Sequence, residues 1–265
     1  MLIDLHAKSN YSPSVNLSPR QVLQQASDAG LDGIAFCETL SSSRCKEILD
    51  LAARDFPDLK VFIGVEIPTD RGIFLGFVPE INSFYTAEEW RWLTHKTTPS
   101  ADAVIELFEE HNGFVIAARP YDLEIPFNMG DFIFTFDRLG AVEVFNPRVG
   151  QLQNNFALEA ATFMGLNTVG GSDPKDDPSV IGQYATFFEE DIQTQRQFVE
   201  ELRESEYWAV QIGSPGTQKS SRKASKSRRS QGGRGSRGGR RSSSRRSNGR
   251  RNSGGRRGSR SNKRS

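Results

Sequence analysis

Short apolar segments alternate with longer amphipathic segments along the first 212 residues of this chain. The apolar segments are typical of buried β-strands, whereas the longer segments place apolar residues at helical spacing. The pattern predicts strands at residues 2–5, 33–37, 60–65, 73–78, 114–118, 141–145, 166–169, 184–188 and 208–212. It predicts helices at residues 20–29, 45–56, 100–112, 152–164 and 192–204, and loops with short helices at residues 80–95 and 121–138.

Alternating strands and helices favour an α/β fold. The first predicted helix has a clear start at Ser18-Pro19, an N-cap followed by proline, and a stop at Gly30. Strand–helix–strand units are right-handed and place their strands in parallel, so we expect a mostly parallel sheet. A closed barrel and an open doubly wound sheet both fit this pattern. No Gly-x-Gly-x-x-Gly follows the first strand, which argues against a dinucleotide-binding fold.

Charge divides the chain into two parts, residues 1–213 and residues 214–265. The second part holds 19 of the 34 Lys and Arg residues and no Asp or Glu. The first part therefore has 15 basic against 33 acidic residues, a formal charge of −18. Residues 214–265 also lack aromatic and branched aliphatic side chains, so they are predicted to be a disordered basic tail. Residues 1–213 are long enough for one domain.

The composition of the tail indicates a polyanionic partner, RNA or DNA. Guanidinium groups bind phosphate in a bidentate manner and stack on bases, and the tail has no aromatic side chain that would add sequence preference. Three alternatives stay open: a solubilising extension, an intramolecular contact with the acidic residues 1–213, and a contact with residues 1–213 of another molecule. The predicted nucleic-acid-binding residues are Arg228, Arg229, Arg234, Arg237, Arg240, Arg241, Arg245, Arg246, Arg250, Arg251, Arg256 and Arg257.

Other classes of protein are disfavoured by composition. No run of about 18 apolar residues is present, so we expect no membrane span and no membrane partner. The N-terminus reads as a strand and lacks the features of a secretory signal. The only cysteines, Cys37 and Cys45, are too few for a disulfide framework or a cysteine-rich zinc site. These features predict a cytoplasmic location.

Charged residues lie at the ends of most predicted strands. In barrels and in open sheets, functional sites form at the carboxyl ends of parallel strands. Carboxylates and imidazoles gathered there are suitable ligands for divalent metals, although loops are polar in any case. The candidate ligands are His6, Glu38, Glu66, Glu143 and Asp173, and Arg119 ends another strand.

Several motifs, in order along the chain, resemble the PHP (polymerase and histidinol phosphatase) family of metallo-phosphoesterases. Asp4-Leu5-His6-Ala7-Lys8-Ser9 resembles the opening DLHxH[ST] motif, and residues 30–39 resemble GLDxIAITDH. Gly64-Val65-Glu66, Ala118-Arg119-Pro120 and Gly171-Ser172-Asp173-Pro174-Lys175 resemble GxE, AHP and GSDxH. The resemblance covers residues 1 to about 212 and implies a distorted (β/α)7 barrel with its site at the carboxyl ends of the strands.

The resemblance also implies that most metal-ligand histidines of the family are replaced in this chain. The family uses His and acidic ligands to hold up to three divalent metals, which activate a water and clamp a phosphate ester. This chain retains His6, Glu66 and Asp173, the candidate catalytic residues. Cations stand at three former histidine positions: Lys8, Arg119 and Lys175.

Two interpretations of these replacements compete. In the first, the chain is a pseudoenzyme without cofactor, in which Lys8, Arg119 and Lys175 compensate the charge of the carboxylates or bind a phosphate, and the tail binds nucleic acid. In the second, a single divalent metal on a reduced site still supports a phosphoesterase or nuclease. A charged nitrogen cannot coordinate a metal and repels it, so the replacements favour the first interpretation.

Overall fold

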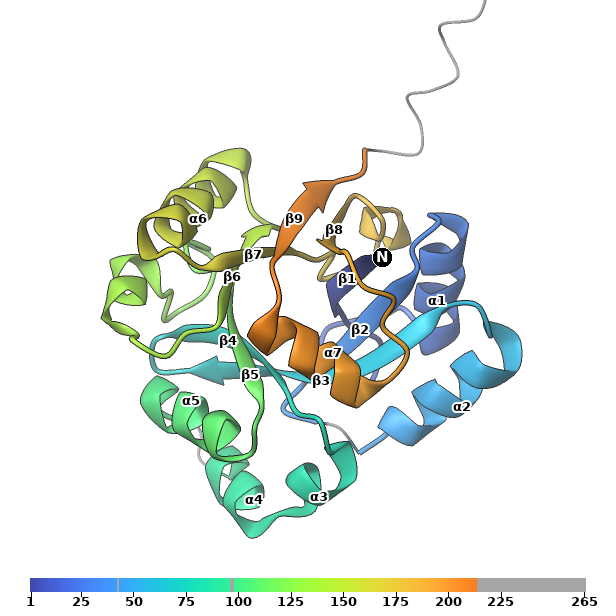
Figure 1. Cartoon of the computed structure of the whole chain (residues 1–265), viewed down its shortest axis with the longest axis horizontal. Coiled ribbons are helices and arrows are strands. Elements are labelled where there is room, and N and C mark those ends of the chain that lie inside the picture. Colours follow the sequence, from blue (N-terminus) through green and yellow to red (C-terminus); the bar gives the residue numbers. More distant parts are fainter. Residues whose placement is uncertain (42, 96–97, 214–265) are drawn as a thin grey trace, which may run out of the picture. The chain divides into compact units, whose positions relative to one another are not determined.

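The structure, a computed structural model, describes residues 1–213 except residue 42 and residues 96–97. The predicted tail and its arginines therefore lie outside the described residues. In the described part, a single sheet of nine strands curls into a ring (Figure 1). The strands are β1 (Leu2–Ala7), β2 (Gly33–Thr39), β3 (Lys60–Thr69), β4 (Gly72–Phe77), β5 (Phe114–Ala118), β6 (Ala141–Phe145), β7 (Asn167–Gly170), β8 (Tyr184–Phe188) and β9 (Tyr207–Gln211).

Helices surround the sheet on its outer face and also close one end of it (Figure 1). The α-helices are α1 (Pro19–Asp28), α2 (Cys45–Asp55), α3 (Ile81–Thr86), α4 (Glu88–Thr94), α5 (Ala101–Glu110), α6 (Gln151–Met164) and α7 (Gln195–Glu204). Two 3₁₀ helices, η1 (Gly130–Thr135) and η2 (Pro178–Val180), lie in loops. The predicted start of α1 is confirmed, because the Ser18 side chain accepts a hydrogen bond from the backbone N–H of Gln21 in a capping box. Among the described residues, every helix is too short or too polar to cross a bilayer.

The sheet is less parallel than the sequence pattern predicts. The strand order is β7-β6-β5-β4-β3-β2-β1-β8-β9. Four neighbouring pairs are parallel, but β3–β4, β4–β5, β1–β8 and β8–β9 are antiparallel. The cause at β3–β4 is a turn of two residues, Asp70 and Arg71, which is too short for the helical crossover that a parallel pair requires. The expectation of a mostly parallel sheet is therefore wrong in detail.

The sheet nonetheless closes almost completely, as expected for a barrel. At the seam, threonine side chains replace the missing backbone ladder between β7 and the strands β8 and β9. Thr186 Oγ1 accepts from the backbone N–H of Gly170 at 3.0 Å, and Thr168 Oγ1 accepts from the N–H of Ala209 at 3.1 Å. These contacts join the two edges of the sheet.

Helix α7 fills the end of the barrel at which β3 begins and β4 ends. The Phe198 ring stacks on Phe62 with centroids 4.3 Å apart and meets Phe77 edge-on. The Gln195 amide donates to the carbonyl of Val78, and it both donates to and accepts from the backbone of Ile63. Because α7 closes this end, the opposite end, where β1, β2 and β3 terminate, is left for a site.

Candidate functional site

The charged side chains predicted at strand ends gather at the open end of the barrel. His6, Glu38, Glu66 and Glu143 come from β1, β2, β3 and β6, and all four are buried. Parallel pairing of β2 with β3 places Thr39 opposite Glu66, and the Thr39 hydroxyl donates to Glu66 Oε1 at 2.9 Å. The sheet register therefore brings these groups together across long stretches of sequence.

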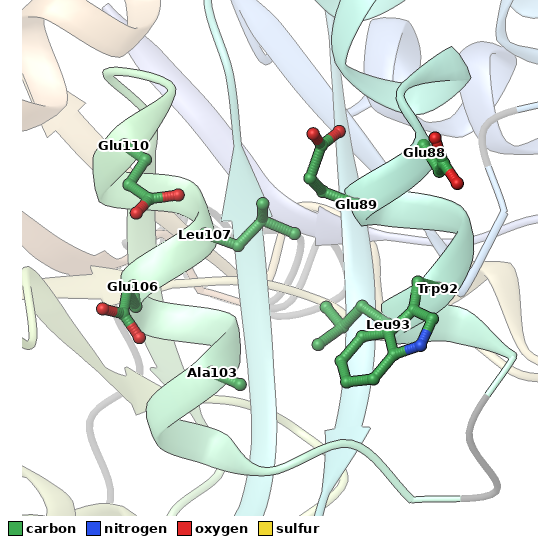
Figure 2. Close-up of a pocket in the computed structure, with 8 residues that line it drawn as sticks. All are labelled: Glu88, Glu89, Trp92, Leu93, Ala103, Glu106, Leu107 and Glu110. Carbon is green, nitrogen blue, oxygen red and sulfur yellow. The ribbon is translucent and has the colours of Figure 1, made fainter.

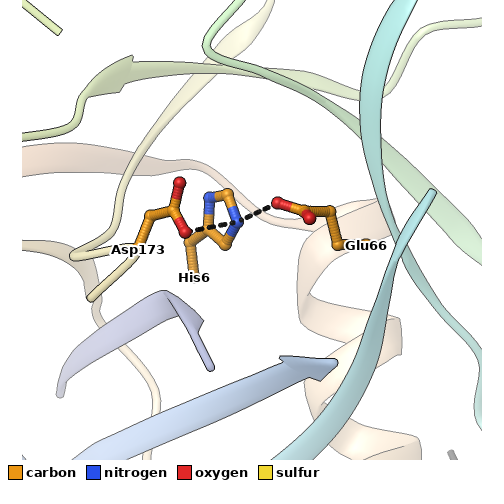
Figure 3. A group of neighbouring side chains, drawn as sticks. All are labelled: His6, Glu66 and Asp173. Atoms are coloured by element: carbon orange, nitrogen blue, oxygen red, sulfur yellow. Dashed lines mark hydrogen bonds and ion pairs between the residues drawn. The ribbon is translucent and has the colours of Figure 1, made fainter. Parts of the chain in front are cut away.

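His6 lies at the centre of the cluster and contacts three carboxylates, two of which, Glu66 and Asp173, are drawn in Figure 3. Its Nδ1 atom is 2.9 Å from Glu143 Oε1. Its Nε2 atom is 3.0 Å from Glu66 Oε2 and 3.8 Å from Asp173 Oδ1. Burial alone would lower the pKa of His6, but the surrounding carboxylates, Glu143 first, raise it to about 9. His6 is therefore an imidazolium at neutral pH, a state in which neither ring nitrogen has a free lone pair.

Lys8 lies between two of these carboxylates. Its Nζ atom is 2.9 Å from Glu66 Oε2 and 2.7 Å from Asp173 Oδ1. The second approach is a charge contact without hydrogen-bond geometry. Burial would lower the pKa of Lys8, but Asp173 and Glu66 raise it above its usual value. Burial would likewise raise the pKa of Glu66, yet Lys8 and His6 hold it well below its usual range.

Arg119 follows β5 and is the second cation of the cluster. Its Nε atom is 3.1 Å from Asp173 Oδ2, and its Nη2 atom is 3.5 Å from Glu66 Oε2. Its Nη1 atom donates to Asp122 Oδ2 at 2.7 Å. The backbone of Arg119 has φ of +45° and its N–H donates to Glu143 Oε2, so the residue is held in an uncommon conformation that turns the side chain inward.

The third predicted cation, Lys175, does not join the cluster, which corrects the sequence-based assignment. Its side chain is exposed, whereas Asp173 is buried. Asp173 has φ of +39° and Pro174 follows it, so the chain turns away from the site before it reaches Lys175. Arg148 takes the place that we predicted for Lys175: its Nη1 atom donates to Asp173 Oδ2 at 2.9 Å. Arg148 lies in the loop after β6, where no family motif marks it.

Two of the candidate metal ligands are bound by neutral donors. The backbone N–H and the hydroxyl of Ser9 donate to Glu38 Oε1, and the Ser12 hydroxyl donates to Glu38 Oε2. The Asn146 amide donates to Glu143 Oε1 at 2.9 Å. Among the described residues, the metal-ligand atoms that converge belong to His6, Glu66 and Asp173, all within 4.8 Å of one another.

One imidazole and two carboxylates are a suitable donor set for a divalent metal, and in this structure the Lys8 side chain lies among the three residues. The Lys8 ammonium contacts both carboxylates, and His6 Nε2 points at Glu66 rather than at open space. A divalent ion at the same point would be within about 4 Å of the ammonium, a repulsion of roughly 8 kcal/mol at an effective dielectric near 20. The cluster is therefore balanced by protein cations. Of the surface hollows described for this part of the chain, one is lined in part by Glu38, and none is lined by His6, Lys8, Glu66, Arg119 or Asp173.

Comparison with solved structures shows the fold. The chain is similar to a predicted metal-dependent phosphoesterase from Bifidobacterium adolescentis, with a TM-score of 0.57 and 15% identity over 76% of this chain and 96% of that chain. It is also similar to a two-domain protein from Bacteroides vulgatus that contains a predicted PHP-like metal-dependent phosphoesterase, with a TM-score of 0.54 and 18% identity over 80% of this chain and 65% of that chain.

A third similar structure is an amidohydrolase from Chromobacterium violaceum, crystallised with bound sulfate and no metal. Its TM-score is 0.58, with 14% identity over 80% of this chain and 98% of that chain. No protein-family model matches the chain, and no curated protein matches its sequence. The fold is therefore PHP-like, as the motifs predicted, and identities this low establish the fold alone.

Proposed function

We propose that this chain is a PHP-like pseudoenzyme in which protein cations stand where the family's metals bind, and whose residues 214–265 bind RNA or DNA. The observation that carries the first half is the position of the Lys8 ammonium, in contact with both Glu66 and Asp173. A metal-activated water requires an open coordination position, and here that space is taken by a side chain.

Arg119 and Arg148 add the remaining positive charges that balance the buried carboxylates. Both guanidinium groups contact Asp173 Oδ2, at 3.1 and 2.9 Å, so this carboxylate meets cations on each of its oxygens. With His6 protonated, the cluster holds four positive groups against the carboxylates of Glu66, Asp173, Glu143, Glu38 and Asp122. Because these charges already pair with one another, a phosphate would have to displace a carboxylate in order to bind.

A second candidate function is a phosphoesterase or nuclease that uses one metal on the reduced site. Two observations favour it: the converging ligand atoms of His6, Glu66 and Asp173, and the lack of any hydrogen bond to Asp173 Oδ1 among the described residues. It requires Lys8 to move away and His6 to lose its proton. We therefore rank it below the pseudoenzyme.

Metal content and activity distinguish the two candidates. We expect untreated protein to contain far less than one equivalent of zinc, manganese or iron by elemental analysis. We also expect phosphatase and exonuclease activity with added manganese to be no higher than that of the Asp173→Ala variant. One bound equivalent would refute the metal-free cluster, and manganese-dependent turnover that Asp173→Ala abolishes would establish the enzyme.

The nucleic-acid half of the proposal rests on charge. The 19 cations of residues 214–265 neutralise phosphates and release counterions, so binding should weaken steeply as salt rises. Fluorescence anisotropy with labelled single-stranded RNA and DNA, at several salt concentrations, measures this slope. We expect a chain that ends at residue 213 to lose most of the affinity. Unchanged binding by the shortened chain would refute this role of the tail.

A further inference from the structure

A groove between α4 and α5 has the chemistry of a receptor for arginine. It is an open hollow of about 640 Å³ on the outer face of the barrel, and none of the residues of the buried cluster lines it (Figures 1 and 2). The buried side chains of Leu93 and Leu107 form its floor, and Trp92, 63% exposed, forms one wall. Four glutamates rim it: Glu88, Glu89, Glu106 and Glu110.

The four glutamates are uncompensated within the described part of the chain. All are exposed, and the ion pairs found there include Glu109 with Arg138 but none of these four. Glu106 and Glu110 are one turn apart on α5, where like charges oppose the helix. Glu110 also ends α5, whose last turn has no basic residue, so it faces the negative end of the helix dipole. A cationic partner would relieve both effects.

The shape and the apolar floor narrow the class of partner to arginine-rich peptide. A guanidinium group stacks on an indole face and binds carboxylates in a bidentate manner, which suits a tryptophan wall beside paired glutamates. Residues 214–265 of this chain provide 15 arginines and 4 lysines with no acidic residue, separated by Gly and Ser. Their charge of +19 complements the −18 of residues 1–213.

We propose that the groove binds the arginine-rich segment, residues 214–265, of a second copy of this chain. In Figure 1, β9, the last described strand, ends on the side of the barrel opposite to α4 and α5. A 213-residue domain is about 40 Å across. A 52-residue coil, as the composition predicts, also spans about 40 Å on average. A coil of this span brings only the later arginines of a chain within reach of its own groove, whereas a neighbouring molecule can present any of its arginines.

Self-association through the groove rests on the proposed function in one respect, the binding of nucleic acid by residues 214–265. A segment held in the groove cannot at the same time bind phosphates, so nucleic acid and self-association compete for the same arginines. Added polynucleotide should therefore dissociate the self-associated form.

The first test is the association state of the full chain. Sedimentation velocity should detect self-association at low salt that is lost at high salt. The variant E88Q/E89Q/E106Q/E110Q should weaken the association constant by about tenfold, as expected for a few exposed ion pairs. The matched control is E189Q/E190Q/E200Q/E206Q, which removes four exposed acids that have no ion pair in the described part. The control should change the association constant by less than about threefold. A monomer at every concentration, or equal effects of the two variants, would overturn the proposal.

The second test identifies the occupant. Carbodiimide coupling joins lysine amines to carboxylates in direct contact, so a mixture of ¹⁴N- and ¹⁵N-labelled full chains can be coupled and mapped by mass spectrometry. We expect mixed-isotope links from Lys219, Lys223, Lys226 or Lys263 to the four glutamates. Links only within one molecule, or to other acids, would contradict the proposal. Nucleic-acid binding is measured separately, so a monomeric chain that still binds RNA would refute the groove assignment and leave the function of the tail intact.

Discussion

The ammonium nitrogen of Lys8 lies 2.7 Å from Oδ1 of Asp173, although 165 positions separate the two residues in the sequence. The pair links β1 to the loop after β7, and the same nitrogen contacts Glu66 in β3. The backbone supports this arrangement, because the N–H of Asp173 donates to the carbonyl of His6 at 2.6 Å. Three strand ends are thus held together by one buried cation.

Removing that cation should destabilise the barrel strongly. We expect Lys8→Met to lower the free energy of unfolding by about 3 to 5 kcal/mol, because it leaves two buried carboxylates without their partner. Asp173→Asn should have a similar cost, and the double variant should cost less than the sum of the two. Urea denaturation measures all three. As a control, Lys46→Met breaks an exposed pair with Asp50 and should cost less than about 1 kcal/mol. Strict additivity of Lys8→Met and Asp173→Asn would show that the pair is not coupled.

Histidines at positions 8 and 119 should create a metal site. In Lys8→His/Arg119→His, two cations become neutral ligands beside Glu66 and Asp173, and the pKa of His6 is then free to fall as metal binds. We expect this variant to hold about one equivalent of zinc after dialysis, measured by elemental analysis. Lys8→Gln/Arg119→Gln removes the same charges but adds no imidazole, and it should hold much less. Equal zinc content in wild type and the histidine variant would mean that the cations do not exclude the metal.

Stability should depend on pH through His6. Its pKa is about 9 in the folded chain and about 6.5 when unfolded, so the folded state binds the proton more tightly. The resulting stabilisation is complete below pH 6.5 and is lost as pH rises through 9. A difference of 2.5 pKa units corresponds to roughly 3 kcal/mol. Urea denaturation from pH 6 to pH 10 should therefore show wild type losing its advantage over His6→Gln in this range. A constant difference between the two would mean that His6 is neutral in the fold.

The fold was largely predictable because buried strands appear in the sequence as short, mostly apolar segments. The strands Phe114–Ala118, Ala141–Phe145 and Tyr184–Phe188 were predicted at the residues where they occur, since each is a short apolar run bounded by polar residues or glycine. Strand direction was not predictable in the same way. The β3–β4 hairpin depends on a turn of two residues with Gly72 at φ of +112°, and apolar periodicity carries no information about direction.

Prediction of the site from the sequence succeeded for residues that belong to the motifs. It failed for residues whose position depends on the conformation of a loop. His6, Lys8, Glu66, Arg119 and Asp173 meet as their positions in the motifs implied. Lys175 is exposed because the backbone turns at Asp173, whereas Arg148, for which the sequence predicted no role, reaches Asp173 from the loop after β6. A side chain that crosses from a neighbouring loop leaves no spacing signal in a single sequence.

Close backbone packing at Gly171 should also contribute to the stability of the cluster. A Cβ atom at this position would lie 2.4 Å from His6 Cβ and 2.9 Å from the His6 backbone nitrogen, both far inside contact distance. Gly171→Ala must therefore push the end of β7 away from β1, and we expect it to lower the free energy of unfolding by about 1 to 3 kcal/mol.

The matched control is Gly150→Ala. Its added Cβ would meet only the Gln153 side chain, which is free to move, and its φ of −71° suits alanine. We expect a cost of about 0.5 kcal/mol there, because Gly150 is the N-cap of α6 and alanine is a poorer N-cap than glycine. The two variants should also differ in the pKa of His6, which NMR titration measures. In Gly171→Ala this pKa should be lower, because the distance of the imidazole from Glu143 and Asp173 increases. If Gly171→Ala were as stable as Gly150→Ala and left this titration unchanged, β1 and β7 would not be packed as closely as the structure indicates.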